Sequence, residues 1–224
     1  MPGGDPSTLQ NVESSLGVDF SVIRIFARWN TVFPDADDQA ILDSGHAIHL
    51  SVRPRSDDGT VVPWSEMAAA QPGSAVYSEK WRRGPIEAIL VGDDGYFTLN
   101  HEPETRDSSG NGGAEDFKAA WRAFTAIVRE RGGANISMAW IMTGGAFSDG
   151  RADEWYPGDD VVDVVGTDPY NWHLCQGTTR DWRPFDSLVS PALSRGSAQQ
   201  ASRGTRVREC GGQGNAWSEG RVDA

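Results

Sequence analysis

Short apolar runs alternate with longer amphipathic segments along most of the chain. Apolar runs rich in β-branched residues cover 21–27, 46–53, 96–100, 136–142 and 161–166, and a weaker run covers 205–210. Their length suits strands, and the second run is bounded by Gly45 and Pro54, which favour turns. The pattern therefore predicts about six strands. Because helical segments separate them, we expect a parallel sheet.

The clearest helix is predicted between the third and fourth runs. Its apolar residues fall on one stripe, at spacings of three and four: Phe117, Ala120, Trp121, Phe124 and Val128. This spacing gives a helix one apolar face, which we expect to cover the sheet. Gly132-Gly133 marks its end. Weaker helical patterns cross 64–70 and 185–200, and another begins near Asp5. The inner face of this last helix is predicted to hold Leu9, Val12 and Leu16.

Parallel strands with helices between them form either a (β/α) barrel or an open doubly wound sheet. The barrel is favoured because reactive side chains follow several strands rather than one glycine-rich turn. A complete barrel has eight strands, whereas this chain opens on a helix and ends shortly after its sixth run. We therefore expect one domain over residues 1–224, an incomplete TIM-type (β/α)8 barrel that lacks the first and last strands.

Composition narrows the choice of ligand. The chain of 224 residues has 20 Lys and Arg against 32 Asp and Glu, a formal net charge of −12. This balance argues against nucleic acid or an anionic membrane as a partner, because both need clustered cations. Nine Trp residues favour a ligand with flat apolar faces, such as a sugar.

Localisation and redox state are only weakly indicated. The sequence has neither an apolar run long enough to span a bilayer nor a signal-peptide pattern at its start. As written, the chain is expected to stay soluble inside the cell, and to be secreted if the true start lies upstream. Cys175 and Cys210 permit at most one disulfide, and two free thiols are the simpler interpretation.

The densest group of reactive side chains follows the third run. Phe97-Thr-Leu-Asn-His-Glu-Pro-Glu104 is an apolar strand that ends in Asn100, His101, Glu102 and Glu104. The C-terminal ends of barrel strands form the mouth where ligands bind, and partial burial there raises the pKa of a carboxyl toward that of a general acid. One of the two Glu residues is therefore a catalytic candidate. The alternative is a helix cap or a solvated loop residue.

Other candidate binding residues lie on other strands. Asp168, Tyr170 and Trp172 follow the fifth run, where a phenol can donate to a carboxylate and an indole can stack on a sugar. Arg28 ends the first run and Trp140 lies within the fourth, and either residue could hold a sugar. Packing is the alternative for Trp172 and Trp140, and surface charge for Arg28.

Two polar residues inside apolar runs have simpler interpretations. Asp163, within the fifth run, must find a partner and is expected to be structural. His46 and His49 differ by three along a strand, so they face opposite sides and cannot share a metal ion. Motifs of esterases, dinucleotide enzymes and NTPases do not occur in the sequence.

Two separated motifs occur in order, each with a predicted strand. The first is Leu99-Asn-His-Glu-Pro-Glu104, and the second is Trp155-Tyr-Pro-Gly-Asp-Asp160 leading into Val162-Asp-Val-Val-Gly-Thr-Asp-Pro-Tyr-Asn-Trp172. From about Leu16 to about Trp182 the chain resembles glycoside hydrolase family 26, the β-mannanase family of the clan A barrels. The resemblance implies that Glu102 is the general acid/base, with His101 beside it. It also implies that Tyr170 hydrogen-bonds the nucleophile, and that the third run is the family's fourth strand.

A retaining glycosidase needs a second carboxylate about 5 to 5.5 Å from the first. Glu209 resembles the family's seventh-strand nucleophile in its place and in the Gly211 that follows it. The resemblance thus implies an endo-acting retaining glycoside hydrolase for a β-linked polysaccharide, of the mannan endo-1,4-β-mannosidase type. Its partner would be the polysaccharide or oligosaccharide substrate, with no metal or other cofactor, and the chain would be a monomer if the fold is complete.

The residues before Glu209 leave two alternatives open. If Glu209 faces the barrel centre, Arg206 and Arg208 point into the helix layer, where unpaired charges are costly. The chain could then be a carbohydrate-binding barrel that has lost catalysis. It could also be an inactive fragment whose open sheet edges are covered by another chain or by further sequence.

Overall fold

The computed structural model describes residues 5–70, 95–130, 135–174 and 179–203. Within these residues, one parallel sheet contains strands in chain order: β1 (Val22–Arg28), β2 (Ala47–Arg53), β3 (Gly95–Leu99), β4 (Ile136–Thr143) and β5 (Val164–Asp168). The helices are α1 (Pro6–Leu16), α2 (Ala36–Asp43), α3 (Trp64–Ala69), α6 (Ala114–Glu130), α7 (Gly144–Ser148) and α8 (Phe185–Arg203). Short 3-10 turns occur at η1 (Arg106–Ser108) and η2 (Arg151–Trp155).

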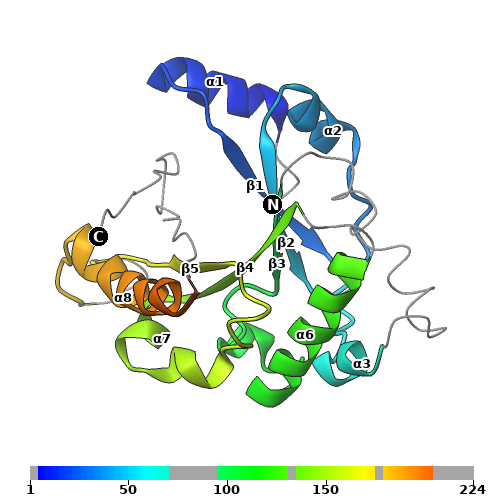
Figure 1. Ribbon diagram of the computed structural model, residues 1–224. Coiled ribbons are helices and arrows are strands. Elements are labelled where there is room, and N and C mark those ends of the chain that lie inside the picture. The colour runs from blue at the N-terminus through cyan, green and yellow to red at the C-terminus, as the bar shows by residue number, and fades with distance from the viewer. Residues whose placement is uncertain (1–4, 71–94, 131–134, 175–178, 204–224) are drawn as a thin grey trace.

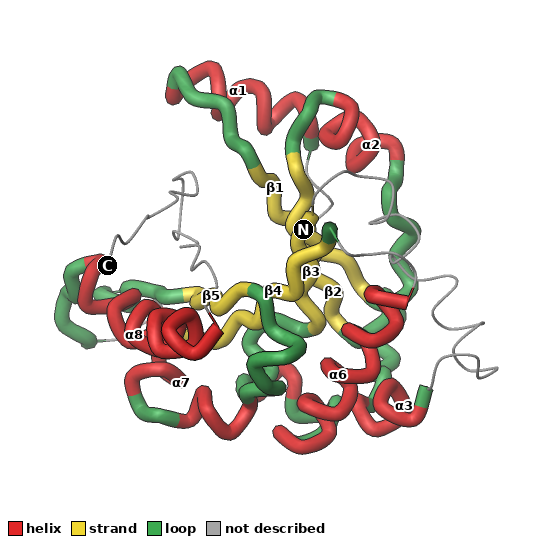
Figure 2. The backbone as a smooth tube through the Cα atoms, viewed as in Figure 1, coloured by secondary structure: helices red, strands yellow, loops and turns green. Residues whose placement is uncertain are grey.

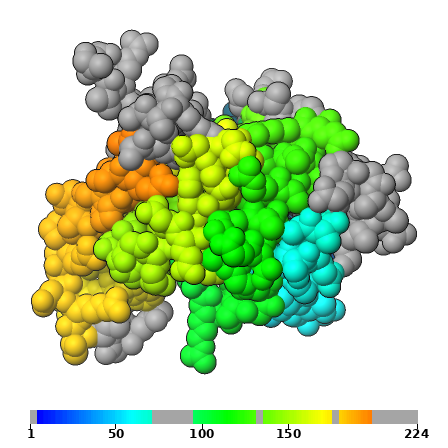
Figure 3. Space-filling view, turned by 60° about the horizontal axis from the view of Figure 1, so that its bottom comes forward, coloured from blue at the N-terminus to red at the C-terminus, as the bar shows by residue number. Residues whose placement is uncertain are grey.

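The outer face of the sheet is covered by helices. Figures 1 and 2 show α3, α6, α7 and α8 around its convex side, and in Figure 3 α3 lies in cyan beside the green α6. All five residues of the stripe predicted for α6 are buried. Phe124 of this stripe stacks on Phe97 of β3, with ring centroids 4.5 Å apart. The predicted helix and its apolar face are therefore confirmed.

The inner face of the same sheet has buried polar residues beside a small apolar cluster of Tyr96, Ala139 and Val164. His49, Ser51 and Thr98 are buried there, and Arg24 of β1 forms an ion pair with Asp168 of β5 at 3.1 Å. In a flat sheet these two edge strands would be about 19 Å apart, at roughly 4.8 Å per strand. The ion pair therefore requires a strongly curved sheet, as in an incomplete (β/α) barrel.

The first four predicted strands agree with β1 to β4 within a residue or two, but the fifth begins later than predicted. Val161 and Val162 are buried before β5 begins, and the Trp121 indole N–H donates to the Val161 carbonyl at 2.9 Å. The two valines are apolar because they are buried next to α6, and this burial made them look like part of the strand in the sequence. The run at 205–210 lies outside the described residues, and the single domain over 1–224 stays a prediction.

The inner face predicted for the first helix is wrong in part. Asp5 caps α1 by accepting from the Ser7 N–H at 2.9 Å, but no α1 residue is buried, and Val12 and Leu16 are exposed. Only Leu9 packs against the core. The reason is position, since α1 lies beyond the end of the sheet rather than over its face (Figure 1). None of the described helices combines the length and apolarity that a membrane span requires.

Asp163 has the structural role predicted for it. Its carboxylate accepts from the backbone N–H of Met138 at 2.9 Å, and its own N–H donates to the Met138 carbonyl at 2.9 Å. Arg129 lies 3.9 Å from the other carboxylate oxygen. Asp163 thus joins the start of β5 to β4 and α6, and its charge is matched.

Candidate active site

A tight turn after β3 positions Glu102. Asn100 and Glu102 have φ values of 50° and 52°, a left-handed conformation that is uncommon outside glycine. Backbone bonds hold the turn, because the Asn100 N–H donates to the Val52 carbonyl at 2.7 Å and the Glu102 N–H to the Ile141 carbonyl at 2.8 Å. The Asn100 amide also donates to the Ser108 hydroxyl at 3.0 Å. Unusual backbone held by its neighbours is typical of functional sites.

The structure gives the two glutamates after β3 different surroundings. Glu104 Oε1 accepts from the Thr143 N–H at 2.9 Å and from the Thr143 hydroxyl at 2.6 Å. Glu104 therefore connects the turn to the end of β4. In the described part of the chain, the Glu102 carboxylate has no such bond and stays accessible. Glu102 is the carboxyl that is free to meet a ligand.

The surroundings of Glu102 favour its protonated form. Burial, followed by the negative charges of Asp168 and Glu104, raises the pKa of Glu102 to about 7, although Arg24 opposes this rise. About half of these carboxyls therefore carry a proton at neutral pH. A carboxyl with such a pKa can donate a proton and later accept one.

His101 is neutral beside Glu102. Burial and the positive charge of Arg24 lower the pKa of His101 to about 4. Its Nδ1 lies 3.2 Å from the Ser51 hydroxyl, and its ring meets Phe26 edge-on at 5.2 Å. A neutral imidazole offers one donor and one acceptor. His101 can therefore hydrogen-bond a ligand without adding charge.

The side chains at the end of β5 lie on the other side of Glu102. Asp168 is held by Arg24, whose guanidinium lies over the Phe26 ring at 4.6 Å. Burial and the charges of Asp168 and Glu102 raise the pKa of Tyr170, so this phenol stays a neutral donor close to both carboxylates. Its ring lies 5.3 Å from that of Trp172. Three of the predicted binding residues, Asp168, Tyr170 and Trp172, thus gather near Glu102 and His101.

Two predicted binding residues have other surroundings. Trp140 is fully buried against Phe147 and Tyr156 on the outer face of β4, so its assignment to the substrate is wrong. Its neighbours along the strand face inward, and alternation sends its own side chain toward the helices. Arg28 does end β1 at the mouth, but it lies 3.5 Å from Asp57 and 3.4 Å from the Ser56 carbonyl. Glu209 lies outside the described residues, and its role stays a prediction.

Sequence reasoning missed Arg24, Phe26 and Ser51, which lie on the inner face around His101. One signal was available, since a charged Arg24 inside an apolar barrel strand must have a partner. The sequence could not show that this partner is Asp168 on another strand. Among the described residues, no three His, Cys, Asp or Glu side chains gather in a way that could hold a metal ion.

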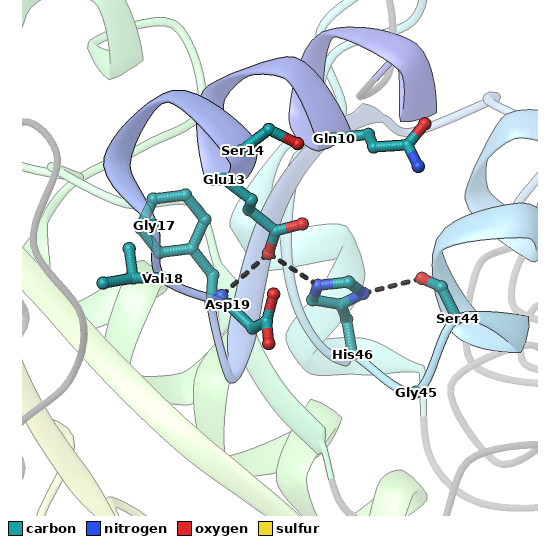
Figure 4. Close-up of a pocket in the computed structure, with 10 residues that line it drawn as sticks. Gln10, Glu13, Ser14, Gly17, Val18, Asp19, Ser44, Gly45 and His46 are labelled. Atoms are coloured by element: carbon teal, nitrogen blue, oxygen red, sulfur yellow. Dashed lines mark hydrogen bonds and ion pairs between the residues drawn. The ribbon is translucent and has the colours of Figure 1, made fainter.

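A pocket of about 580 Å³ lies at the opposite end of the strands, between α1 and the start of β2. Figure 4 shows that His46 reaches Glu13 on one side and Ser44 on the other, at 2.9 and 2.7 Å. Glu13 also accepts from the Phe20 N–H at 2.7 Å. These polar groups bond to one another across the pocket, so they connect α1 to the sheet. They lie far along the strands from Glu102 and take no part in its site.

One family model and one curated protein match this chain. The model of glycosyl hydrolase family 26 matches residues 104–192, which contain Asp168, Tyr170 and Trp172 and begin two residues after Glu102. Endoglucanase H of Acetivibrio thermocellus is 25% identical over 198 residues, which cover 83% of this chain and 21% of that protein. The chain thus spans about a fifth of the length of that curated relative.

Solved structures give the same fold. The family 26 domain of an endo-β-mannanase/endo-β-glucanase from Prevotella bryantii has a TM-score of 0.57 and 15% identity, covering 93% of this chain and 74% of that one. A family 26 β-mannanase from Bacteroides ovatus has a TM-score of 0.60 and 18% identity, covering 88% and 63%. At these identities the similarity shows a common fold, the (β/α) barrel.

Proposed function

We propose that this chain, a member of glycoside hydrolase family 26, is an endo-acting glycosidase that cleaves a β-linked polysaccharide with retention. The observation that carries the proposal is Glu102, an unengaged carboxyl with a pKa of about 7 at the C-terminal end of a barrel strand. The names of the Prevotella and Bacteroides proteins include β-mannanase, which supports a β-mannan as the first substrate to test, and we propose the β-1,4-linked polymer.

In the first step, Glu102 donates its proton to the glycosidic oxygen as the bond to the anomeric carbon breaks. The carboxylate of Glu209 attacks that carbon and forms the glycosyl ester. In the second step, Glu102 accepts a proton from water, whose oxygen attacks the same carbon and releases Glu209. Both steps use a carboxyl that changes protonation near neutral pH, as Glu102 does.

The neighbours of Glu102 can supply the remaining interactions. The phenol of Tyr170 can donate a hydrogen bond to the attacking carboxylate, because Tyr170 stays protonated near Asp168 and Glu102. His101, as a neutral ring held by Ser51, can hydrogen-bond a sugar hydroxyl. Burial and the negative charge of Asp168 raise the pKa of Glu102, which favours the form that donates a proton. These roles are part of the proposal.

The test is Glu102→Gln. Hydrolysis of β-mannan should fall by about 100-fold or more, because general acid catalysis contributes roughly 10²–10⁴-fold. An aryl mannoside with an acidic leaving group should lose less in its first step, since that group leaves almost without a proton. Equal losses on both substrates would contradict the assignment.

Glu104→Gln is the matched control. A glutamine oxygen can still accept from Thr143, whose bonds to Glu104 are at 2.9 and 2.6 Å, so the turn should be kept. We expect this variant to retain β-mannan hydrolysis within about fivefold, because Glu104 takes no part in proton transfer. A loss of activity as large as that of Glu102→Gln would contradict the assignment of Glu102 as the acid/base and of Glu104 as a structural residue.

Labelling tests the nucleophile and the non-catalytic alternative together. A 2-fluoro mannosyl inactivator should form an ester on Glu209, to be detected by peptide mass. A chain that binds mannan, is never labelled and shows no turnover is a carbohydrate-binding barrel instead.

A further inference from the structure

The segment after β5 presents an exposed indole. Trp182 is 69% exposed, whereas Trp64, Trp121 and Trp140 are completely buried. A Trp side chain has a large apolar area, which folding normally removes from water. A single exposed apolar residue needs no explanation by itself, so the surroundings of Trp182 decide whether it is a candidate for binding.

Trp182 is held in place rather than carried by a loose loop. The Asn171 amide donates to the Arg183 carbonyl at 2.7 Å, and His173 Nδ1 lies 2.9 Å from the Arg180 carbonyl. These two contacts bracket Trp182 along the chain. The ring of His173 also meets the indole edge-on at 6.0 Å. The backbone on both sides of Trp182 is thus bonded to residues 171–173, and the indole keeps one ring contact with them.

Trp182 contacts the segment that also carries Tyr170 and Trp172. Tyr170, which lies close to the charges of Glu102 and Asp168, stacks near Trp172 at 5.3 Å. The next residue, His173, contacts Trp182. The aromatic rings therefore continue from the active site outward along one loop. All of them follow the C-terminal end of β5, the end of the sheet at which Glu102 lies.

Charged residues flank Trp182 in the chain. Arg180, Asp181 and Arg183 are all exposed. A flat apolar face with hydrogen-bonding groups at its edge suits a pyranose, whose faces carry C–H groups and whose rim carries hydroxyls.

We propose that Trp182 is the stacking platform of a distal subsite, which binds a sugar unit of the polysaccharide beyond the units that contact Glu102. This inference rests on the proposed function, because its occupant is the same sugar chain. The subsite would make binding depend on chain length. It would also favour cleavage within a long polymer, because a short oligosaccharide cannot reach Trp182 and Glu102 together.

The experiment measures binding without turnover, in a Glu102→Gln background. Calorimetry with mannobiose and with mannohexaose compares Trp182→Ala with the parent. We expect Trp182→Ala to weaken hexaose binding by about tenfold, the size of one aromatic stacking contact, and biose binding by less than about twofold. Trp182→Phe should keep most of the hexaose affinity, since a phenyl ring also offers a flat face.

Leu174→Ala is the matched control. Leu174 is 74% exposed on the same loop, but its side chain has no flat face to stack on a sugar. Its removal should leave the affinity for both sugars unchanged. Equal losses in Leu174→Ala and Trp182→Ala would mean that the loop as a whole matters, and would overturn the proposal.

Other outcomes are also decisive. Unchanged hexaose binding in Trp182→Ala overturns the distal subsite and leaves the proposed function standing. Equal weakening of biose and hexaose overturns it too, because the effect would lie at the active site. A change in sedimentation of Trp182→Ala with sugar binding intact would assign this surface to a second copy of the chain. A parent that binds neither sugar, nor mannan itself, would reject the proposed function together with the subsite.

Discussion

The two faces of the sheet are both buried, yet they are built from opposite chemistry. On the outer face, β2, β3 and β4 direct apolar side chains against α6, and Phe97 stacks on Phe124. On the inner face, β2 and β3 direct His49, Ser51 and Thr98 toward one another, beside a small apolar cluster that includes Ala139 of β4. The Arg24–Asp168 ion pair crosses this face. One strand thus supplies stability on one side and chemistry on the other.

Because the two faces of the sheet differ in chemistry, we expect them to respond differently to mutation. An apolar contact contributes through area and close fit, so deleting it leaves a cavity. A polar group on the inner face contributes through its charge or hydrogen bond, and its removal changes the electrostatics around Glu102 more than the packing. Stability and activity should therefore be separable by face.

The largest effect is expected from Phe124→Ala on the outer face. Phe124 is nearly completely buried and stacks on Phe97 at 4.5 Å. Its truncation should lower the free energy of unfolding by about 3–5 kcal/mol, measured by urea denaturation. The pH profile of the molecules that remain folded should not change, because the inner face is untouched.

The matched control for Phe124→Ala is Glu115→Ala on the exposed side of the same helix. Its ion pair with Lys118 is a surface contact, so the loss should be within about 0.5 kcal/mol. A loss below about 1 kcal/mol in Phe124→Ala itself would show that α6 does not cover the core as described.

A pair of substitutions on the inner face should move the pH profile in opposite directions. Asp168 raises the pKa of Glu102 and Arg24 lowers it. The acid must be protonated, so activity falls as pH rises past this pKa. Asp168→Asn should shift the alkaline limb of kcat/KM to lower pH, and Arg24→Met should shift it to higher pH, each by roughly one unit.

The opposed signs make this pair informative. A general loosening of the site would lower activity in both variants and shift their limbs in the same direction. If both limbs move together, or neither moves, Glu102 is not the group whose protonation limits the reaction. Arg28→Met is the control, because this arginine lies at the mouth but pairs with Asp57. Its charge is not among the main causes of the pKa shift of Glu102, so its removal should leave the alkaline limb in place.

The sequence could predict the outer face better than the inner one. The stripe from Phe117 to Val128 follows the helical period, and its burial follows from that period alone. Trp140 shows where this prediction from sequence fails. Whether a strand residue faces the barrel centre or the helices depends on how the strand is placed in the sheet, and an apolar run alone does not reveal that placement. Its burial against Phe147 and Tyr156 emerged only from the fold.

The catalytic candidates were predicted by a different route. Glu102 and His101 could be found because they follow an apolar strand, and the resemblance then distinguished Glu102 from Glu104. The Thr143 bonds to Glu104 give the physical reason for that choice. The pairing of Arg24 with Asp168 could not be predicted, because these residues are 144 positions apart and meet only when the sheet curves.

The smallest effect is expected from Ser51→Ala, which removes one hydroxyl from the inner face. Ser51 is buried, and its hydroxyl lies 3.2 Å from His101 Nδ1. A neutral hydrogen bond contributes about 1 kcal/mol, and alanine leaves little empty space. We expect the free energy of unfolding to fall by about that amount or less.

In kinetics, KM of Ser51→Ala should rise a few-fold while kcat changes less, because His101 is proposed to bind a sugar hydroxyl in the ground state as well as in the transition state. Ser51→Thr, which keeps the hydroxyl, should restore much of the affinity. If Ser51→Ala instead costs as much stability as Phe124→Ala, the inner face is also held by packing, and the division between the two faces does not hold.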